Sequence, residues 1–96
     1  MATRTTITFP ELKSKLYAHD KVKVIDVREI SEYREGHIEG SVLIPLDELP
    51  YRLHEIEPHD EIVVVCKSGN RSSQACTILQ QRGFTNVRSL VGGLSS

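Results

Sequence analysis

Short apolar runs with the spacing of β-strands alternate along this chain with segments of helical spacing. Residues 62–65 are Ile-Val-Val-Val, and such a run without polar interruption is typical of a strand buried on both faces of a parallel sheet. β-branched and aromatic residues predict further strands at residues 5–9, 22–27, 42–44 and 87–90. This alternation of strands and helices indicates one α/β domain, residues 1–96, built on a mainly parallel sheet.

Helices are predicted between these strands from apolar periodicity and from residues that begin or end helices. Pro10 suits the first turn of a helix that ends at His19, and a short helix over residues 29–34 is closed by Gly36. A third helix ends before Pro58 and presents one apolar face, formed by Leu46, Leu49, Leu53 and Ile56. The last spans residues 71–82, is capped by Gly83, and turns Ala75, Ile78 and Leu79 inward.

The composition narrows the classes of partner. With 96 residues, 39% of them hydrophobic, and a net charge of −1, the chain has the composition of a small globular domain without the basic excess of nucleic-acid-binding proteins. The sequence contains no apolar run of the roughly 18 residues that a membrane span needs. The first residues, Met-Ala-Thr-Arg-Thr-Thr, lack the apolar core of a signal peptide. We therefore expect a cytoplasmic domain with neither nucleic acid nor membrane as partner.

Cys66 lies at the junction between the predicted strand 62–65 and the predicted helix 71–82. Gly69 and Asn70 do not extend the strand, because both residue types favour turn conformations with positive φ. A thiol at this junction faces unpaired backbone N–H groups and the positive end of a helix dipole. These features lower the pKa of a thiol and favour a nucleophilic thiolate. We therefore predict that Cys66 is reactive.

The polar loop that follows can curl so that its N–H groups converge on the sulfur as an anion nest. Its residues are Lys67, Ser68, Gly69, Asn70 and Arg71, and Gly69 permits close approach of the backbone.

The side chains of the loop allow more than one role. Arg71 either binds an oxyanion substrate or forms a structural ion pair with Asp26 or Glu32. Lys67 is either a solvated lysine or a group that attracts an anionic substrate. Ser68 either donates a hydrogen bond to the sulfur or only favours the turn.

The remaining candidates for chemistry receive structural interpretations. Ser72 and Ser73 are interpreted as residues that begin a helix, because no histidine adjoins them in the sequence. Cys76 falls within that helix and is interpreted as a small core residue. The predicted separation of Cys66 and Cys76 exceeds the roughly 7 Å between Cα atoms that a disulfide tolerates, so two free thiols are expected.

Two blocks of short motifs extend along almost the whole chain. The first is Val-Ile-Asp-Val-Arg-Glu at residues 24–29, followed by Glu-Tyr at 32–33, Gly-His-Ile at 36–38, Gly-Ser at 40–41 and Ile-Pro at 44–45. The second is Cys-Lys-Ser-Gly-Asn-Arg-Ser at residues 66–72, followed by Gly-Phe at 83–84 and Val-Gly-Gly at 91–93. In order and spacing these motifs resemble those of single-domain rhodaneses, which are sulfurtransferases. The resemblance implies a five-stranded, mainly parallel sheet with helices on both faces.

The resemblance also implies a reaction. Cys66 would take a sulfane sulfur from thiosulfate or another persulfide donor, hold it as a persulfide, and pass it to cyanide, a protein thiol or a small-molecule thiol. The amides of residues 67–71 would cradle the persulfide, with Asp26 as structural support, Arg28 at the pocket mouth and His37 as a structural hydrogen-bonding residue. No cofactor or metal is implied, and His19, His54 and His59 lack metal-ligand spacing. The alternative is a sulfur carrier or interaction module that accepts sulfur from a protein partner and turns over little thiosulfate.

Two features of the sequence bear on this resemblance. Four residues separate Cys66 from Arg71, whereas relatives that act on phosphate or arsenate have one more, and Val65 stands where a phosphatase would have histidine. Both favour sulfur chemistry over a cysteine-dependent phosphatase. Leu43 occupies a position where relatives commonly have Asn, and the segment with Trp or Tyr that usually follows Gly-Gly is replaced by Leu-Ser-Ser. A truncated C-terminal segment, or a fragment of a larger protein, is therefore expected.

Overall fold

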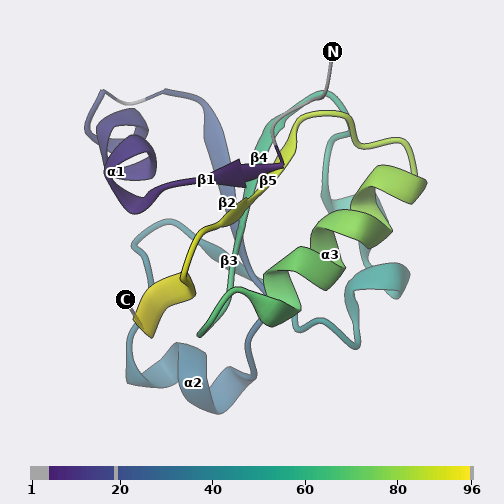
Figure 1. Cartoon of the computed structure of the whole chain (residues 1–96). Helices are drawn as coiled ribbons and strands as arrows, with labels where there is room; N and C mark the ends of the chain where they lie inside the picture. Colours follow the sequence, from purple (N-terminus) through teal and green to yellow (C-terminus); the bar gives the residue numbers. More distant parts are fainter. Residues whose placement is uncertain (1–4, 19, 96) are drawn as a thin grey trace.

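A five-stranded sheet, parallel throughout, forms the centre of the computed structural model, which describes residues 5–18 and 20–95 (Figure 1). The predicted α/β fold is confirmed. The strand order is β1-β5-β4-β2-β3. The strands are β1 (Thr6–Ile7), β2 (Val22–Asp26), β3 (Val42–Leu43), β4 (Glu61–Val65) and β5 (Val87–Leu90). The central strand is therefore β4, the strand that leads directly into Cys66.

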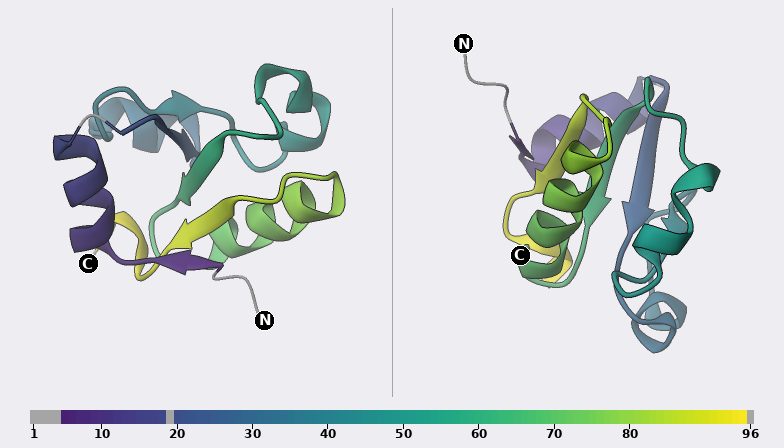
Figure 2. Two further views of the ribbon diagram at one scale, coloured as in Figure 1. Left: turned by 90° about the horizontal axis from the view of Figure 1, so that it is seen from above. Right: turned by 90° about the vertical axis from the view of Figure 1, so that its right-hand side faces the viewer.

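Helices cover both faces of this sheet, as expected (Figures 1 and 2). One face carries α1 (Phe9–Tyr17), and the other carries α3 (Asn70–Gln81) with the 3₁₀ helices η1 (Leu49–Tyr51) and η2 (Leu53–Glu55). The short helix α2 (Ile30–Glu35) lies at the end of the sheet where β2 and β4 terminate, and η3 (Gly93–Ser95) follows β5. The carboxyl ends of the strands, α2, the start of α3 and η3 therefore meet at one end of the domain.

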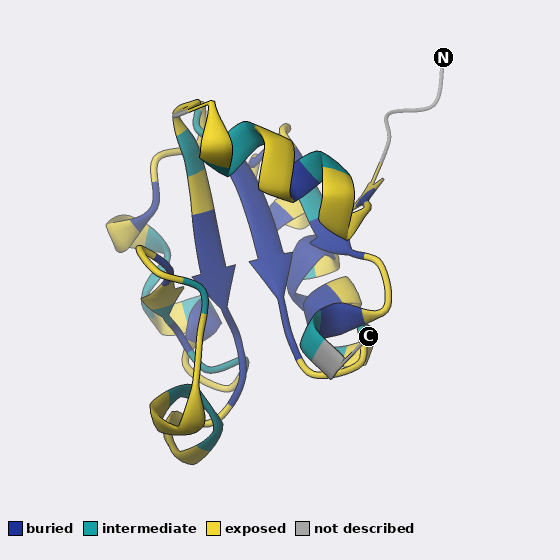
Figure 3. Ribbon diagram, turned by 90° about the vertical axis from the view of Figure 1, so that its left-hand side faces the viewer, coloured by how far each residue is buried: buried dark blue, intermediate teal, exposed yellow. Residues whose placement is uncertain are grey.

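Two apolar clusters pack against the two faces, and the alternation along β4 decides which residues join each. Val63 and Val65 belong to the cluster under α1, whereas Ile62, Val64 and Cys66 belong to the cluster under α3. Side chains of a strand point alternately to the two faces, so this register turns the Cys66 side chain toward α3. The central strands are buried along most of their length (Figure 3). The register of a buried strand thus decides which face of the sheet the Cys66 side chain enters.

The first strand is shorter than the predicted 5–9, because Thr8 begins a helix. The Thr8 side chain accepts a hydrogen bond from the Glu11 amide (3.3 Å), and Glu11 Oε1 accepts one from the Thr8 amide (3.2 Å). This capping box satisfies two helix-terminal amides. Thr-Phe-Pro-Glu at residues 8–11 carries that signature in the sequence, and it outweighs the strand propensity of Phe9. The helix ends at Tyr17, and His19 lies outside the described residues.

The predicted helix over residues 46–56 is wrong in type. The segment forms two 3₁₀ turns, with Arg52 N donating to Leu49 O (3.1 Å) and Ile56 N to Leu53 O (3.1 Å). Pro50 lacks an amide hydrogen, so a continuous α-helical ladder would lose a bond at this point. Leu49 and Ile56 still enter the core, as their spacing required.

Candidate active site

Cys66 Sγ sits within a ring of hydrogen-bond donors at the end of β4. The Gly69 amide donates to it (3.0 Å), as does the Ser72 amide (3.3 Å), and the Ser72 hydroxyl lies 3.4 Å away. Ser72 is the third residue of α3, so its amide is one of the first-turn donors that have no partner inside the helix. The sulfur therefore occupies the position where an N-capping oxygen would otherwise sit.

Gly69 makes this curl of the loop feasible. It caps α3 with φ of 99° in the left-handed region, where side chains are strained and glycine is not. Asn70, for which a positive φ was also predicted, instead begins the helix. The single left-handed residue turns the backbone so that the amides of residues 69 and 72 point back at the sulfur.

The pKa of the Cys66 thiol is lowered, although two opposing effects act on it. Burial is the largest and raises the pKa, because it disfavours the charged thiolate. Hydrogen bonds from the Ser72 hydroxyl and from the amides of Ser72, Gly69 and Ser68 together outweigh it. Cys66 has no exposed surface, yet these polar groups surround its sulfur. The site therefore favours a thiolate while excluding water.

The predicted loop residues divide into those that face the sulfur and those that do not. Ser68 and Gly69 contribute amides, whereas the exposed side chains of Lys67 and Asn70 make no hydrogen bond to the sulfur within the described residues. Ser72 was interpreted only as a helix-start residue, but it provides both a hydroxyl and an amide. Its position on the inner face of the first turn of α3 could have indicated this.

Arg71 pairs with Glu32, one of the two carboxylates considered from the sequence. Its Nη1 and Nη2 donate to the two oxygens of Glu32 at 2.7 and 3.0 Å. The guanidinium, together with the Glu29 amide, lowers the pKa of Glu32 to about 2, and Glu32 in turn raises the pKa of Arg71. This bidentate pair connects the start of α3 to α2. It therefore orients the cysteine loop, which leads directly into α3.

Asp26 and Arg28 form a second bidentate pair that is buried. Arg28 Nε and Nη2 donate to Asp26 at 2.9 and 2.8 Å, and Nη2 also donates to the carbonyl of Gly36 at 2.7 Å. Asp26 has no exposed surface, and its hydrogen bonds are the largest factor that raises the pKa of Arg28. The pair holds the turn after β2 against the end of α2.

His37 is not one of the donors around Cys66 Sγ, and it contacts Tyr33 instead. Its Nδ1 is 2.8 Å from the Tyr33 carbonyl, and the two rings stack with centroids 3.7 Å apart. Tyr33 Oη donates to the Ser41 carbonyl at 2.6 Å, so these residues brace the segment after α2. Among the described residues no cluster of His, Cys, Asp and Glu could hold a metal ion.

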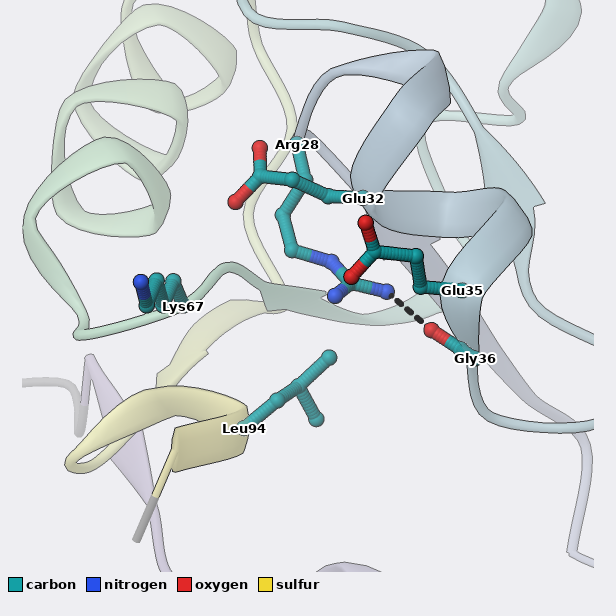
Figure 4. A pocket seen from close by; sticks show the side chains of 6 residues that line it. All are labelled: Arg28, Glu32, Glu35, Gly36, Lys67 and Leu94. Atoms are coloured by element: carbon teal, nitrogen blue, oxygen red, sulfur yellow. Dashed lines mark hydrogen bonds between the residues drawn. The ribbon is translucent and has the colours of Figure 1, made fainter.

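A pocket of about 310 Å³ opens beside the loop. It is lined by Arg28, Glu32, Glu35, Gly36, Lys67 and Leu94, which come from α2 and the turn before it, the loop after β4, and η3 (Figure 4). Lys67, which directly follows Cys66, projects at its edge. The pocket therefore adjoins the loop that follows Cys66 and presents charges of both signs.

The glycine pair after β5 packs on the backbone of the cysteine loop. Leu94 N donates to the Cys66 carbonyl (2.8 Å), and a Cβ on Gly93 would meet the Lys67 carbonyl oxygen at 2.4 Å. Only glycine fits such a close approach. The end of the described chain thus packs directly against the cysteine loop.

Cys76 has a contrasting environment. It belongs to the buried face of α3, and burial alone raises the pKa of its thiol to about 12. Both cysteines are free. Only one of the two thiols is therefore surrounded by groups that stabilise a thiolate.

Comparison with known proteins decides the family. The sequence profile of the Rhodanese-like domain matches residues 8–96. The chain belongs to the rhodanese-like family. A solved structure of the human single-domain sulfurtransferase TSTD1 resembles this rhodanese-like domain with a TM-score of 0.84 and 30% identity, covering 95% of this chain and 92% of TSTD1.

Relatives of this rhodanese-like chain include sulfurtransferases and a candidate sulfur carrier protein. YrkF of Bacillus subtilis (strain 168), the candidate carrier, is 39% identical over 88 residues. This alignment covers 92% of this chain but only 48% of YrkF, so the chain spans about half the length of that relative. The thiosulfate sulfurtransferase PspE of Escherichia coli (strain K12) is 39% identical over 72 residues, which are 73% of this chain and 68% of PspE. The family relationship supports sulfur transfer in general.

The rhodanese-like chain has no helix, within residues 5–18 and 20–95, that is long and apolar enough to cross a membrane. The longest, α3, has 12 residues and carries polar side chains on its outer face.

Proposed function

We propose that this chain is a sulfurtransferase in which Cys66 carries the transferred sulfur. The donor is thiosulfate or another persulfide donor, and the acceptor is cyanide, a protein thiol or a small-molecule thiol. The observation that carries the proposal is the ring of donors around Cys66 Sγ, with the amides of Gly69 and Ser72 at 3.0 and 3.3 Å.

The reaction proceeds in two displacements. The Cys66 thiolate attacks the outer sulfur of thiosulfate, a sulfur–sulfur bond forms to Sγ, and sulfite leaves with the electron pair of the broken bond. In the second step the acceptor thiolate or cyanide attacks the outer sulfur of the persulfide, and the Cys66 thiolate leaves. A lower thiol pKa increases the fraction of attacking thiolate in the first step and improves the leaving group in the second.

The surrounding residues support these steps in different ways. Lys67, at the pocket edge, attracts an anionic donor, while the amides of Ser68 and Gly69 stabilise negative charge on sulfur. Arg71 orients the loop through Glu32, and Asn70 starts the helix whose first turn faces the sulfur.

Three residues more distant from the sulfur shape the pocket wall. Asp26 holds Arg28 at the pocket mouth, and Arg28 in turn holds the Gly36 carbonyl. His37 stacks on Tyr33 and so braces the segment that follows α2. Because Cys66 has no exposed surface, a donor reaches Sγ only after the side chain rotates or the loop shifts.

The direct test is release of thiocyanate from thiosulfate and cyanide by the purified chain. Cys66→Ser should abolish it, whereas Cys76→Ser should retain most of it, because burial raises the pKa of the Cys76 thiol and makes it a poor nucleophile. An active Cys66→Ser variant together with an inactive Cys76→Ser variant would overturn the assignment of the nucleophile.

A second candidate function is a sulfur carrier with little thiosulfate turnover. One observation favours it, the 39% identity to the candidate sulfur carrier YrkF. Mass spectrometry distinguishes the two. Addition of one sulfur atom to Cys66 by thiosulfate alone supports the enzyme, whereas addition only in the presence of a protein donor, such as a cysteine desulfurase, supports the carrier.

A further inference from the structure

The hydroxyl of Ser72 lies at the centre of a buried polar cluster that reaches from the sulfur to β5. Its Oγ is 3.4 Å from Cys66 Sγ, 3.1 Å from the Gly69 carbonyl and 2.6 Å from the hydroxyl of Ser89. Ser72 has no exposed surface and Ser89 is 4% exposed. A hydroxyl has one hydrogen, so Ser72 can donate to only one of these three neighbours at a time.

The position of Ser89 on the sheet explains why it reaches Ser72. Ser89 pairs with Val64 in the ladder between β5 and β4, two residues before Cys66. Residues two apart on a strand share a face, so Ser89 and Cys66 both point toward α3. Ser89 thus approaches Ser72 from the sheet, although the two serines are 17 positions apart in the sequence.

The neighbours of Ser89 fix the direction of the bond between the two serines. In the part of the chain that the structure describes, Ser72 is the only hydrogen-bond partner of the Ser89 hydroxyl. A buried hydroxyl that donates to nothing loses a bond it would make in water. Ser89 therefore donates to Ser72 Oγ, and the hydrogen of Ser72 is left for either the Gly69 carbonyl or the sulfur.

The Gly69 carbonyl does not depend on Ser72. It also accepts hydrogen bonds from the amide of Ser73 (3.1 Å) and from the hydroxyl of Ser73 (2.8 Å). A carbonyl has two lone pairs, so those two donors already satisfy it. When the thiol of Cys66 ionises, the Ser72 hydrogen is free to turn from Gly69 to the sulfur.

We propose that Ser89 is a positioning residue for the sulfur chemistry, because its donated hydrogen bond holds the Ser72 hydroxyl with its hydrogen directed at the Cys66 thiolate. This role rests on the proposed function of Cys66 as the sulfur-carrying thiolate. Hydrogen bonds in such a chain polarise one another, so the bond from Ser89 strengthens the one from Ser72 to the sulfur. The effect favours the free thiolate, which is both the attacking group of the first step and the leaving group of the second.

The test measures the rate of Cys66 alkylation by iodoacetamide against pH in a Cys76→Ser background, in which Cys66 is the only thiol. Ser89→Ala should raise the pKa of Cys66 by about half a unit. This change lowers the thiolate fraction at neutral pH roughly threefold. Ser89→Thr, which keeps the hydroxyl, should restore the original profile. Thermal unfolding of each variant shows that the domain is folded at the assay temperature.

A double-mutant cycle separates positioning from a general structural effect. In a Ser72→Ala background, Ser89→Ala should cause no further shift, because its partner is absent. An equal shift with and without Ser72, or no shift in either background, would overturn the proposal.

The alkylation profile does not depend on turnover. If wild-type protein releases no thiocyanate and acquires no sulfur, but the cycle gives the expected coupling, the proposed function fails, and what stands is only the effect of Ser89 on the Cys66 thiolate.

Discussion

Gly93→Ala tests whether the chain end after β5 holds the cysteine loop in place. A Cβ at this position would lie 2.4 Å from the Lys67 carbonyl oxygen, 2.5 Å from its carbon and 2.7 Å from the Cys66 carbonyl oxygen. All three atoms belong to the backbone, so no side-chain rotation relieves the overlap. Contacts of real Cβ atoms with their neighbours are rarely shorter than 3.4 Å, so η3 and the loop must separate by about 1 Å.

The cost of this separation is estimated from two effects. The Leu94 amide, now 2.8 Å from the Cys66 carbonyl, would lose its hydrogen bond, which costs about 1 kcal/mol. Strain from the extra methyl in a packed site adds about 1–3 kcal/mol. Gly93 also has φ of 67°, which costs an alanine about 1–2 kcal/mol wherever it occurs.

Gly40→Ala is the matched control, because Gly40 has φ of 85° but no atom within 4 Å of the place that an added methyl group would occupy. Chemical unfolding with urea should place Gly93→Ala about 2–4 kcal/mol below Gly40→Ala in free energy of unfolding. Small domains have about 5–15 kcal/mol in total, so the difference is measurable. If the two variants unfold within about 0.5 kcal/mol of one another, the tight packing of Gly93 on the loop is refuted.

Three further predictions concern the ion pairs and the second thiol. Asp26→Asn should lower the free energy of unfolding by about 3–5 kcal/mol in urea titrations, because it leaves the Arg28 guanidinium buried without its charged partner. A loss below about 1 kcal/mol would contradict the buried pair. The lowered pKa of Glu32 means that its stabilising effect is complete above its ordinary value of 4.5 and is lost as pH falls toward about 2. Glu32→Gln should therefore flatten the acid limb of stability against pH, and an unchanged acid limb would contradict the pair with Arg71. Cys76 should resist alkylation below pH 9 in the folded chain, since its thiol pKa is raised to about 12; labelling as fast as that of Cys66 would show that it is not buried.

The sequence predicted most strands well because apolar runs follow directly from burial on both faces of the sheet. The strand at residues 87–90 has the predicted bounds, and the run at residues 62–65 is the central strand with one added residue, Glu61. The bounds and type of an element were predicted less well where two local sequence signals competed. Thr8 begins a helix although strand-forming residues surround it, and Pro50 converts a helical apolar pattern into 3₁₀ turns.

The part of the candidate site that depends on local backbone geometry could be predicted from the sequence. A cysteine between a buried strand and a helix faces the helix amides because the backbone path dictates it, and the structure places amides of residues 69 and 72 at the sulfur. Contacts between distant segments could not be predicted, because they depend on register and on side-chain packing. Glu32 and Arg71 are 39 residues apart, and the sequence left Asp26 open as the alternative partner. Ser89 gave no signal, since a serine in a strand has many structural uses.

The most direct measurement of the central claim is the pH dependence of Cys66 alkylation in the Cys76→Ser variant, with and without prior treatment with thiosulfate. The ring of amides and the Ser72 hydroxyl predict a pKa of Cys66 below the ordinary thiol value. After thiosulfate, the label should be attached through an added sulfur atom, because the thiol has become a persulfide. A pKa at or above the ordinary value, combined with a labelled product that thiosulfate leaves unchanged, would contradict a stabilised thiolate that takes up sulfur.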